Sequence, residues 1–314
     1  MKKYLAVIMA AMVILFGVQL GMEQLFTARR LETVPAMAET KETVAEQVAQ
    51  VQQENQEELP EIYAIFGVDA DEGDKGRSDC ILLMSFEKES GTLRMCSIAR
   101  DTMVTIPGEG KKTKLGHAYS MGGPEKAMET LNENFGLNIQ HYASVNFSQM
   151  ADIVDLMGGV EVELTQAEWN YMGLGEPYLG LKRLNGPEAL KYCRIRSIDS
   201  DDVRTGRQRT LIASMLGHLR DIPRARLPEL LADGIKMCRT NVGFGNLLRL
   251  GKTVLSVKNG VETVSMALPG DSVNAWGGIR EDGVWYYVYD LGQASQVVSE
   301  FFYGESAQRV LGDM

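Results

Sequence analysis

CILLMSFEKESGTLRMCSIARD (80–101) contains two apolar runs separated by a short polar segment. This pattern predicts two strands around a turn at Glu89–Gly91. The preceding run IYAIFGVDA (62–70) predicts a third buried strand that ends at a loop. Strand patterns alternate with helical patterns along the rest of the chain, and this alternation predicts an α/β sandwich.

The remaining elements follow from apolar periodicity and from glycine and proline signals. Further strands are expected over 141–147, 160–164, 261–267 and 285–290. Helices are expected over 124–135, 147–159, 187–192, 203–220, 227–237, 244–255 and 292–302. The segment 111–127 is interpreted as a polar loop that runs into the first of these helices.

The chain has 314 residues and a formal net charge of −10. This acidic balance argues against nucleic acid as a partner, because nucleic-acid binding usually requires a basic face. It does not exclude a local anion site. Four widely spaced cysteines form no CxxC motif, which disfavours a zinc site. We interpret them as small buried hydrophobes rather than as a disulfide framework. They are Cys80, Cys96, Cys193 and Cys238.

The N-terminal segment 4–22 is an uncharged apolar run behind Lys2 and Lys3. A run of about 20 apolar residues matches one bilayer span. The nearest small-residue site, at 36–38, lies too far downstream for a cleaved signal peptide, so the run predicts an uncleaved anchor. The two lysines favour a cytoplasmic N-terminus. The expected organisation is a cytoplasmic tip at 1–3, a transmembrane signal anchor at 4–22, a Glu/Gln-rich spacer at 23–61 and an extracytoplasmic domain at 62–305.

The segment RIRSIDSDDVRTGRQR (194–209) places five arginines and three aspartates within sixteen residues of an acidic protein. A buried guanidinium costs several kcal/mol unless it is paired. Arginines that converge on one place therefore need anions, which are either the local aspartates or a ligand. Arginine's planar fork suits phosphate oxygens. On this segment alone, both explanations stay open.

Helical phase divides these arginines. The stripe of Leu211, Ile212, Met215, Leu216 and Leu219 forms the buried face of the helix over 203–220. Extending the stripe backwards places Arg204 and Gln208 on the inward face. Arg207 and Arg209 fall on its flanks, where a solvated charged face is expected. If 192–196 is extended, Arg194 and Arg196 share one face.

Three other loops carry charged residues. Asp69 ends one expected strand, while Arg77 and Asp79 begin the next, and two carboxylates at adjacent strand ends can share Mg²⁺. Arg100 and Asp101 end a further strand. Lys112 and Lys114 add positive charge to the polar loop, and Gly122–Gly123 precede an expected helix N-terminus that could bind an anion. Together these residues are typical of metal-assisted phosphoryl transfer. The three histidines, His117, His141 and His218, are assigned structural roles.

These motifs resemble the LytR–CpsA–Psr family of bacterial envelope phosphotransferases. The resemblance rests on GVDADEGDKGRSDCILLMSF, SIARDTMVTIPG, KLGHAYSMGGPE, VNF with IVDLMGGVEVEL, and LNGPEALKYCRIR with DSD and R..RQ. Their order and spacing hold across about 62–220, and 223–305 resembles the family's C-terminal part more loosely. The resemblance implies a three-layer α-β-α sandwich around a mixed central sheet, preceded by one transmembrane helix. It also implies a hydrophobic tunnel for a lipid tail with a charged mouth.

The implied activity is transfer of a glycopolymer from a polyprenyl-pyrophosphate carrier to peptidoglycan outside the membrane. The implied cofactor is Mg²⁺, with Mn²⁺ as the alternative. Position by position, the resemblance makes Asp69 and Asp79 the metal ligands. It places Arg77, Arg100, Lys114, Arg194, Arg196, Arg204 and Gln208 around the pyrophosphate. Arg77, Arg100 and Asp101 are the implied catalytic residues, with Asp101 as an acid/base or orienting group.

The sequence departs from the family pattern at two positions. Gly116 stands where Asn is usual, and Ala99 stands where Pro is usual. The first departure bears on the geometry of the loop. Two other functions remain open: a hydrolase of the same lipid pyrophosphate, and a non-catalytic envelope regulator that binds it. The Asp69/Asp79 pair argues against the regulator, because a pure binder has less need of a metal site.

Overall fold

The structure is a computed structural model that describes residues 60–69, 76–87, 90–195, 198, 201–218, 233, 236–242 and 262–304. Within these residues, no helix has both the length and the apolar character needed to cross a bilayer. The expected anchor over 4–22 and the spacer up to residue 59 lie outside the described residues, as does the expected helix over 244–255 and nearly all of that over 227–237.

A six-stranded mixed sheet forms the middle of the fold, with strand order β10-β3-β2-β1-β6-β9. Its strands are β1 (Ile62–Asp69), β2 (Arg77–Glu87), β3 (Thr92–Ile98), β6 (His141–Asn146), β9 (Arg239–Thr240) and β10 (Glu262–Leu268). β1 runs parallel to β6 and β3 runs parallel to β10, while the other neighbouring pairs are antiparallel. The expected strands over 62–70, 80–101, 141–147 and 261–267 are confirmed.

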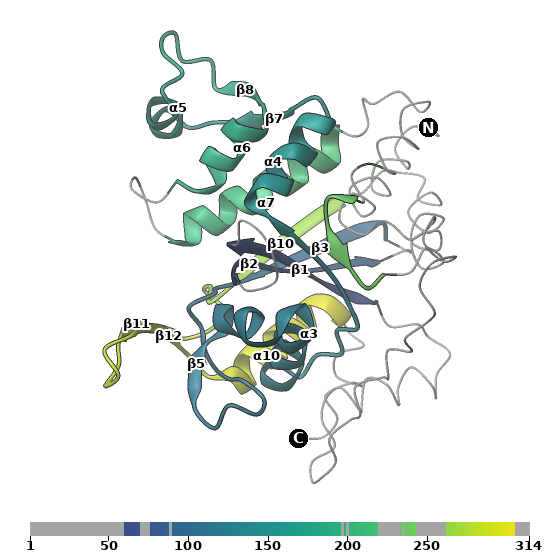
Figure 1. The fold of residues 1–314 in the computed structure, drawn as a ribbon, viewed down its shortest axis with the longest axis vertical. Helices are drawn as coiled ribbons and strands as arrows, with labels where there is room; N and C mark the ends of the chain where they lie inside the picture. Colours follow the sequence, from purple (N-terminus) through teal and green to yellow (C-terminus); the bar gives the residue numbers. More distant parts are fainter. Residues whose placement is uncertain are drawn as a thin grey trace.

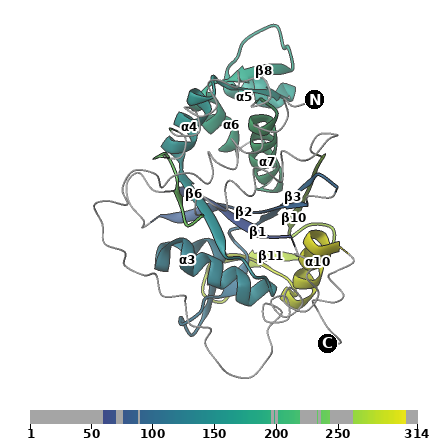
Figure 2. The same cartoon turned by 90° about the vertical axis from the view of Figure 1, so that its right-hand side faces the viewer.

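Helices cover both faces of this sheet, as Figures 1 and 2 show. One face carries α4 (Phe147–Leu156), α5 (Gln166–Met172), α6 (Gly186–Cys193) and α7 (Asp201–His218). The other face carries α3 (Leu115–Phe135) and α10 (Leu291–Tyr303). The described residues therefore form the expected three layers around a mixed sheet.

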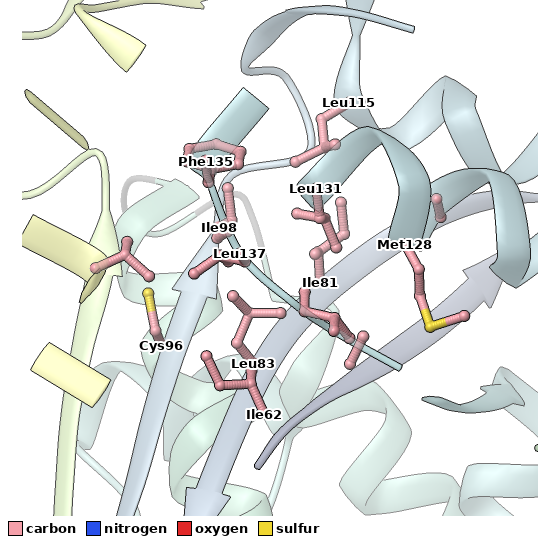
Figure 3. Close-up of a cluster of buried hydrophobic side chains, with 14 of the residues drawn as sticks. Ile62, Ile81, Leu83, Cys96, Ile98, Leu115, Met128, Leu131, Phe135 and Leu137 are labelled. Carbon is pink, nitrogen blue, oxygen red and sulfur yellow. The ribbon is translucent and has the colours of Figure 1, made fainter. Parts of the chain in front are cut away.

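Two apolar cores separate the sheet from its helical layers. Side chains alternate along β1, so Tyr63 and Ile65 enter the core beneath α4–α7, while Ala64 and Phe66 enter the opposite core. Figure 3 shows that second core, with Leu83 and Ile98 of the sheet beside Leu131 and Phe135 of α3. Because both faces are covered, the central strands are apolar on both sides, and their sequences appear as continuous hydrophobic runs.

The cysteines belong to these cores. Cys96 is buried in the core beneath α3, and the other three pack against the core beneath α7. Burial raises the pKa of the Cys96 thiol to about 12, so it stays protonated. The interpretation of the cysteines as small hydrophobes is confirmed.

Within the described residues, three two-stranded antiparallel sheets lie outside the main sheet. They are β4 (Met103–Thr105) with β5 (Lys112–Lys114), β7 (Val160–Glu163) with β8 (Leu181–Leu184), and β11 (Trp276–Ile279) with β12 (Trp285–Val288). The sequence predicted only β7 and β12. Strands of three or four residues contain too few alternations for a periodic signal.

Helix α3 starts much earlier than the sequence predicted. The expected loop over 111–127 is wrong from Leu115 onward, because helical structure continues across a kink at Gly122 and Gly123. Gly123 has a φ of +70°, and a Cβ at this position would lie 3.2 Å from a carboxylate oxygen of Glu125. The Glu125 carboxylate and the Arg239 guanidinium both lie beside the kink, 3.6 Å apart, and the anion site expected at this point stays a prediction.

The segment before α7 also differs from expectation. The extended conformation considered for 192–196 is wrong at its start, because Tyr192 and Cys193 end α6 and Arg194 caps it. The helices expected over 187–192, 203–220 and 292–302 are confirmed as α6, α7 and α10. Arg196 lies outside the described residues.

Candidate active site

The charged residues gather at one edge of the central sheet. β1 and β6 end there together, since Val68 pairs with Asn146, and β2 begins there, since Arg77 pairs with Asp69. β3 and β10 also end at this edge, because they run antiparallel to β2. Ligands of open α/β sheets bind in such places, beyond the carboxyl ends of the strands.

A β-bulge sets the position of Asp79. Gly67 pairs with Cys80 and Val68 pairs with Ser78, so Asp79 is the extra residue between two regular pairs. A bulge bends its strand and re-aims a side chain, and bulges are common beside active sites. The Asp79 carboxylate forms an ion pair with the Arg100 guanidinium, and its side chain is only 10% exposed.

Four alternating charges extend along this edge. Arg100 contacts Asp79 with one guanidinium nitrogen, and its Nε lies 3.5 Å from Asp101 Oδ2. Lys114 Nζ lies 2.6 Å from Asp101 Oδ1. These side chains are 10–23% exposed, so water screens the pairs less than it screens surface pairs. We call Asp79, Arg100, Asp101 and Lys114 the charge chain.

Backbone hydrogen bonds hold the middle of the charge chain in place. Gly116 N donates to Arg100 O at 2.9 Å, and Leu115 N donates to Thr102 O at 2.9 Å. Tyr287 N donates to Asp101 O at 2.9 Å. The start of α3 and the β11–β12 hairpin therefore hold the backbone carbonyls of Arg100, Asp101 and Thr102 in place. This fixed backbone preorganises the side chains of Arg100 and Asp101.

His117 lies beside the charge chain, although the sequence reasoning assigned it a structural role. Its Nδ1 lies 3.1 Å from Thr113 Oγ1. Burial lowers the pKa of His117, the positive charges of Arg77, Lys114 and Arg100 lower it further, and Asp101 opposes them. The imidazole is therefore neutral near pH 7. Its position three residues after Lys114, within KLGHAY, is the signal that could have identified it.

Arg204 and Gln208 take the inward positions that helical phase predicted. The Arg204 side chain is buried and that of Gln208 is half-buried, while Leu211, Ile212 and Met215 continue the buried stripe. Burial raises the pKa of the Cys80 thiol to about 11, and the charge of Arg204 opposes this rise. Arg204 thus lies within electrostatic reach of Cys80 on β2, the residue that follows Asp79.

The expectation that Arg207 faces water is wrong. Its Nε donates to Glu168 Oε1 at 2.6 Å, its Nη1 donates to Ile195 O at 3.2 Å, and its side chain is 3% exposed. The physical reason is that α5 brings Glu168 against the flank of α7, and helical phase within α7 cannot reveal this. Arg209, on the other flank, is half-buried.

Arg194 lies apart from the charge chain. Its guanidinium carbon sits 4.5 Å from the centroid of the Phe147 ring, at the point where β6 leads into α4. Its side chain is exposed. A guanidinium held over an aromatic face keeps its donors available for another partner. Arg194 is therefore positioned at the same sheet edge, near the end of β1.

Asp69 and Asp79 lie on neighbouring strands at this edge, and the magnesium site expected from the sequence stays a prediction. Asp69 is the exposed last residue of β1, and Asp79 lies in the adjacent bulge. In the described part of the chain, no group of three or more His, Cys, Asp or Glu residues could hold a metal by itself. Mg²⁺ commonly binds through one or two carboxylates, with water and substrate phosphates completing its shell. This donor set fits Mg²⁺ better than zinc.

Comparison with known proteins identifies the family. The family model described as LytR_cpsA_psr matches residues 28–302. The chain belongs to the LytR–CpsA–Psr family. A curated member from Bacillus licheniformis, the polyisoprenyl-teichoic acid–peptidoglycan teichoic acid transferase TagU, is 30% identical over 232 residues, covering 73% of this chain and 72% of that protein.

Solved structures share the fold. TagT bound to LIIa-WTA superposes with a TM-score of 0.63 at 22% identity, covering 87% of this chain and 96% of that one. The LytR-CPS2A-psr family protein YwtF (TagT), with bound octaprenyl pyrophosphate lipid, superposes with a TM-score of 0.58 at 21% identity. That match covers 78% of this chain and 91% of the other.

The two departures from the LytR–CpsA–Psr pattern have structural explanations. A Cβ on Gly116 would lie 2.8 Å from Ser78 O and 3.1 Å from Arg100 Cβ, so only glycine lets α3 approach the charge chain this closely. Ala99 N donates to Leu268 O at 2.7 Å and links β3 to β10. Proline has no N–H and cannot make that bond. In this chain, asparagine at position 116 or proline at position 99 would therefore weaken the backbone contacts that close the sheet edge.

Proposed function

We propose that this protein transfers a glycopolymer from a polyprenyl-pyrophosphate carrier to a hydroxyl of peptidoglycan, outside the membrane to which residues 4–22 anchor it. The observation that carries the proposal is the charge chain at the sheet edge. His117 of α3 lies within electrostatic reach of it, and the buried Arg204 of α7 lies within electrostatic reach of Cys80, which follows Asp79. Family membership supports it, because TagU is named as a transferase of polyisoprenyl-linked teichoic acid to peptidoglycan.

The pyrophosphate binds among cations that come from both sides of the edge. Arg100 and Lys114 approach from the charge chain, and Arg77 from the start of β2. Arg194 approaches from the end of α6 and Arg204 from α7, where Gln208 adds a neutral amide donor. Arg196 lies outside the described residues and is assigned to this site on the family resemblance alone. Preorganised donors of this kind stabilise the negative charge that develops on the leaving phosphate in the transition state. Such electrostatic stabilisation is usually the largest single contribution to the rate enhancement.

Asp69 and Asp79 would hold Mg²⁺, or Mn²⁺ in its place. The ion supplies charge neutralisation on the phosphate oxygens when it is bound. Asp79 also pairs with Arg100, so the same carboxylate orients an arginine towards the substrate. Asp101 bridges Arg100 and Lys114 and acts as the orienting group for both cations.

The reaction exchanges one phosphorus–oxygen bond for another. The acceptor hydroxyl oxygen bonds to the phosphorus that carries the glycan, and the bond from that phosphorus to the bridging oxygen breaks. The electron pair leaves with polyprenyl phosphate. His117 accepts the hydroxyl proton, because burial and the neighbouring cations keep its imidazole neutral.

The test is transfer in vitro by the full-length chain in detergent. The donor is a polyprenyl-pyrophosphate glycan and the acceptor is a mixture of peptidoglycan oligomers, with Mg²⁺ present. We expect conjugated product, and Arg100→Ala should lower kcat/KM by about 10²–10³-fold because it removes one preorganised donor. Arg183→Ala is the matched control, since this arginine pairs with Glu161 on the exposed β7–β8 hairpin.

Other outcomes decide against the proposal. Free glycan without conjugate indicates a hydrolase that uses water as the acceptor. Donor binding that survives Asp69→Ala, with no metal-dependent turnover, indicates a non-catalytic binder. Full activity of the double variant Arg194→Ala, Arg196→Ala contradicts the assignment of these two arginines to the pyrophosphate site. Each product is separated by size and counted by a label on the glycan.

A further inference from the structure

The β11–β12 hairpin exposes an unusual set of apolar side chains. Ile279 is 68% exposed and Trp285 is 38% exposed, on two strands that pair with Ile279 opposite Trp285. Figure 1 shows this hairpin projecting away from the body of the molecule. Exposed apolar groups gathered on one element mark a binding surface rather than a part of the core.

One face of the hairpin carries three large side chains. The register places Gly277 opposite Tyr287 and Ile279 opposite Trp285, so these four residues share a face. A Cβ on Gly277 would lie 2.7 Å from the Trp285 ring, so the indole lies directly against the glycine backbone. The Trp285 and Tyr287 rings meet edge to face, with centroids 4.6 Å apart. The three side chains Ile279, Trp285 and Tyr287 are called the aromatic platform.

The opposite face of the hairpin serves a different purpose. Tyr286 is buried there, its hydroxyl donates to Asp282 at 2.8 Å, and Lys114 Nζ lies 5.9 Å from its ring centroid. Trp276 also lies on this face and covers Gly278. This face therefore docks the hairpin against the charge chain through Tyr286, while Trp276 stays 51% exposed. On the other face, Ile279 and Trp285 are exposed and Tyr287 is half-buried.

The aromatic platform is continuous with the candidate active site. Tyr287 N donates to Asp101 O at 2.9 Å, and Tyr287 forms a β-bridge with Thr102. Thr102 Oγ1 and Tyr289 Oη lie 3.0 Å apart. A molecule seated on the platform is thus placed next to Asp101 by a rigid backbone connection.

The hairpin and α7 lie on opposite sides of the sheet, and this arrangement indicates which of the two substrates reaches the platform. The hairpin lies on the side of α3 and α10, and α7 with Arg204 lies on the other side, in both views. In phosphoryl transfer the attacking and leaving oxygens are roughly in line on opposite sides of phosphorus. If the leaving polyprenyl phosphate is held on the α7 side, the acceptor arrives from the hairpin side.

The charges at the hairpin tip disfavour a lipid surface as the occupant. Arg280, Glu281 and Asp282 lie between the strands, so the tip is net acidic. Hydrogen bonds from Val284 N and the Tyr286 hydroxyl lower the pKa of Asp282, which keeps its carboxylate charged. Anionic membrane surfaces attract basic segments and repel acidic ones. Carboxylates beside aromatic rings suit a neutral polyol, because they accept hydrogen bonds from its hydroxyls.

We propose that the aromatic platform of Ile279, Trp285 and Tyr287 binds pyranose rings of the peptidoglycan acceptor strand and presents a hydroxyl to the charge chain. A pyranose ring turns a face of C–H bonds towards the negative face of an aromatic ring, and each such contact is weak but additive. This inference rests on the proposed function and names the surface that recognises its acceptor.

The test measures binding without turnover. The full-length chain in detergent is pelleted with insoluble peptidoglycan sacculi that have been stripped of attached polymers. Trp285→Ala should weaken binding by about tenfold, because it removes the main stacking surface. Trp285→Phe should keep most of the affinity. Trp276→Ala is the matched control, because it removes an exposed indole from the opposite face of the same hairpin and should leave binding unchanged.

Kinetics give the second readout. With a saturating donor and soluble glycan chains as acceptor, Trp285→Ala should raise the acceptor KM by about tenfold and leave kcat unchanged. Unchanged sacculus binding by Trp285→Ala overturns the proposal, as does equal loss in Trp276→Ala. Loss of binding to phosphatidylglycerol vesicles, with sacculus binding intact, assigns the platform to the membrane instead. Because pelleting needs no chemistry, it remains informative even if the transfer assay fails.

Discussion

Replacing Glu168 by alanine should destabilise the protein more than any single change at its surface. Glu168 Oε1 accepts from Arg207 Nε at 2.6 Å, and the two side chains are 7% and 3% exposed. Its other oxygen accepts from Thr165 N at 2.7 Å and from Thr165 Oγ1 at 2.9 Å. The substitution therefore takes the carboxylate away from a buried guanidinium and removes the capping box of α5 at the same time.

The magnitude follows from these two losses. Removing one partner of a buried ion pair costs about 3–5 kcal/mol, because the carboxylate no longer offsets the desolvation of the guanidinium. Arg207 keeps its bond to Ile195 O and its position 6.0 Å from the Tyr192 ring centroid. Loss of the cap adds about 1 kcal/mol. For a domain of this size, each 1 kcal/mol lowers Tm by roughly 2–4 °C, so the expected fall is roughly 8–24 °C.

Thermal and urea unfolding of the full-length chain in detergent measure this effect. Trp169 is a built-in fluorescence reporter, since it is buried next to Glu168 and its Nε1 donates to Gly175 O. Glu161→Ala is the matched control, because its ion pair with Arg183 is about half exposed and should contribute within about 1 kcal/mol. A Glu168→Ala protein whose stability stays within about 1 kcal/mol of the parent would refute the assignment of a buried, structural pair.

Four further predictions concern three residues at the sheet edge. Gly116→Asn should destabilise the fold by about 1–3 kcal/mol, because its Cβ meets Ser78 O and Arg100 Cβ, and unchanged thermal unfolding contradicts this. Ala99→Pro should cost about 1 kcal/mol through the lost bond to Leu268 O, measured by urea unfolding, where an unchanged midpoint is the contrary result. Folding lowers the pKa of His117 below its ordinary value of 6.5, so as the pH falls through 6.5 the unfolded chain takes up a proton before the folded chain does. The contribution of this group to the free energy of unfolding should therefore rise with pH in the window just below 6.5. The acidic limb of kcat/KM should have its midpoint below pH 6.5 and vanish in His117→Gln; a midpoint at or above 6.5 counts against the role of this imidazole as base.

Local sequence patterns predicted the parts of the fold that depend on burial alone. The hydrophobic runs at 62–70 and 80–101 became β1, β2 and β3 because strands covered on both faces must be apolar throughout. The helical stripe predicted that Arg204 points inward, and the side chain is 2% exposed. In each case the information lies within the same helix or strand as the residue concerned.

The patterns failed where the deciding partner is distant in sequence. Glu168 lies 39 residues before Arg207, so no spacing within α7 could reveal the pair. Glycine signals at 122 and 123 suggested a helix start, whereas they mark a kink within α3. The lowered pKa of His117 likewise depends on Arg77, at the start of β2, and on Asp101, which follows β3.

The sequence by itself determined the strand and helix periodicity, the inward phase of α7 and the inventory of arginines and aspartates, because each is a property of neighbouring residues. Only the tertiary structure decided which charges meet. The bulge at Asp79 turns its carboxylate to Arg100, the absence of a side chain at Gly116 lets α3 close on the same residue, and Tyr287 binds Asp101 from a distant part of the chain. These contacts depend on the order and direction of strands in the sheet, which pairwise long-range packing sets and local periodicity does not contain.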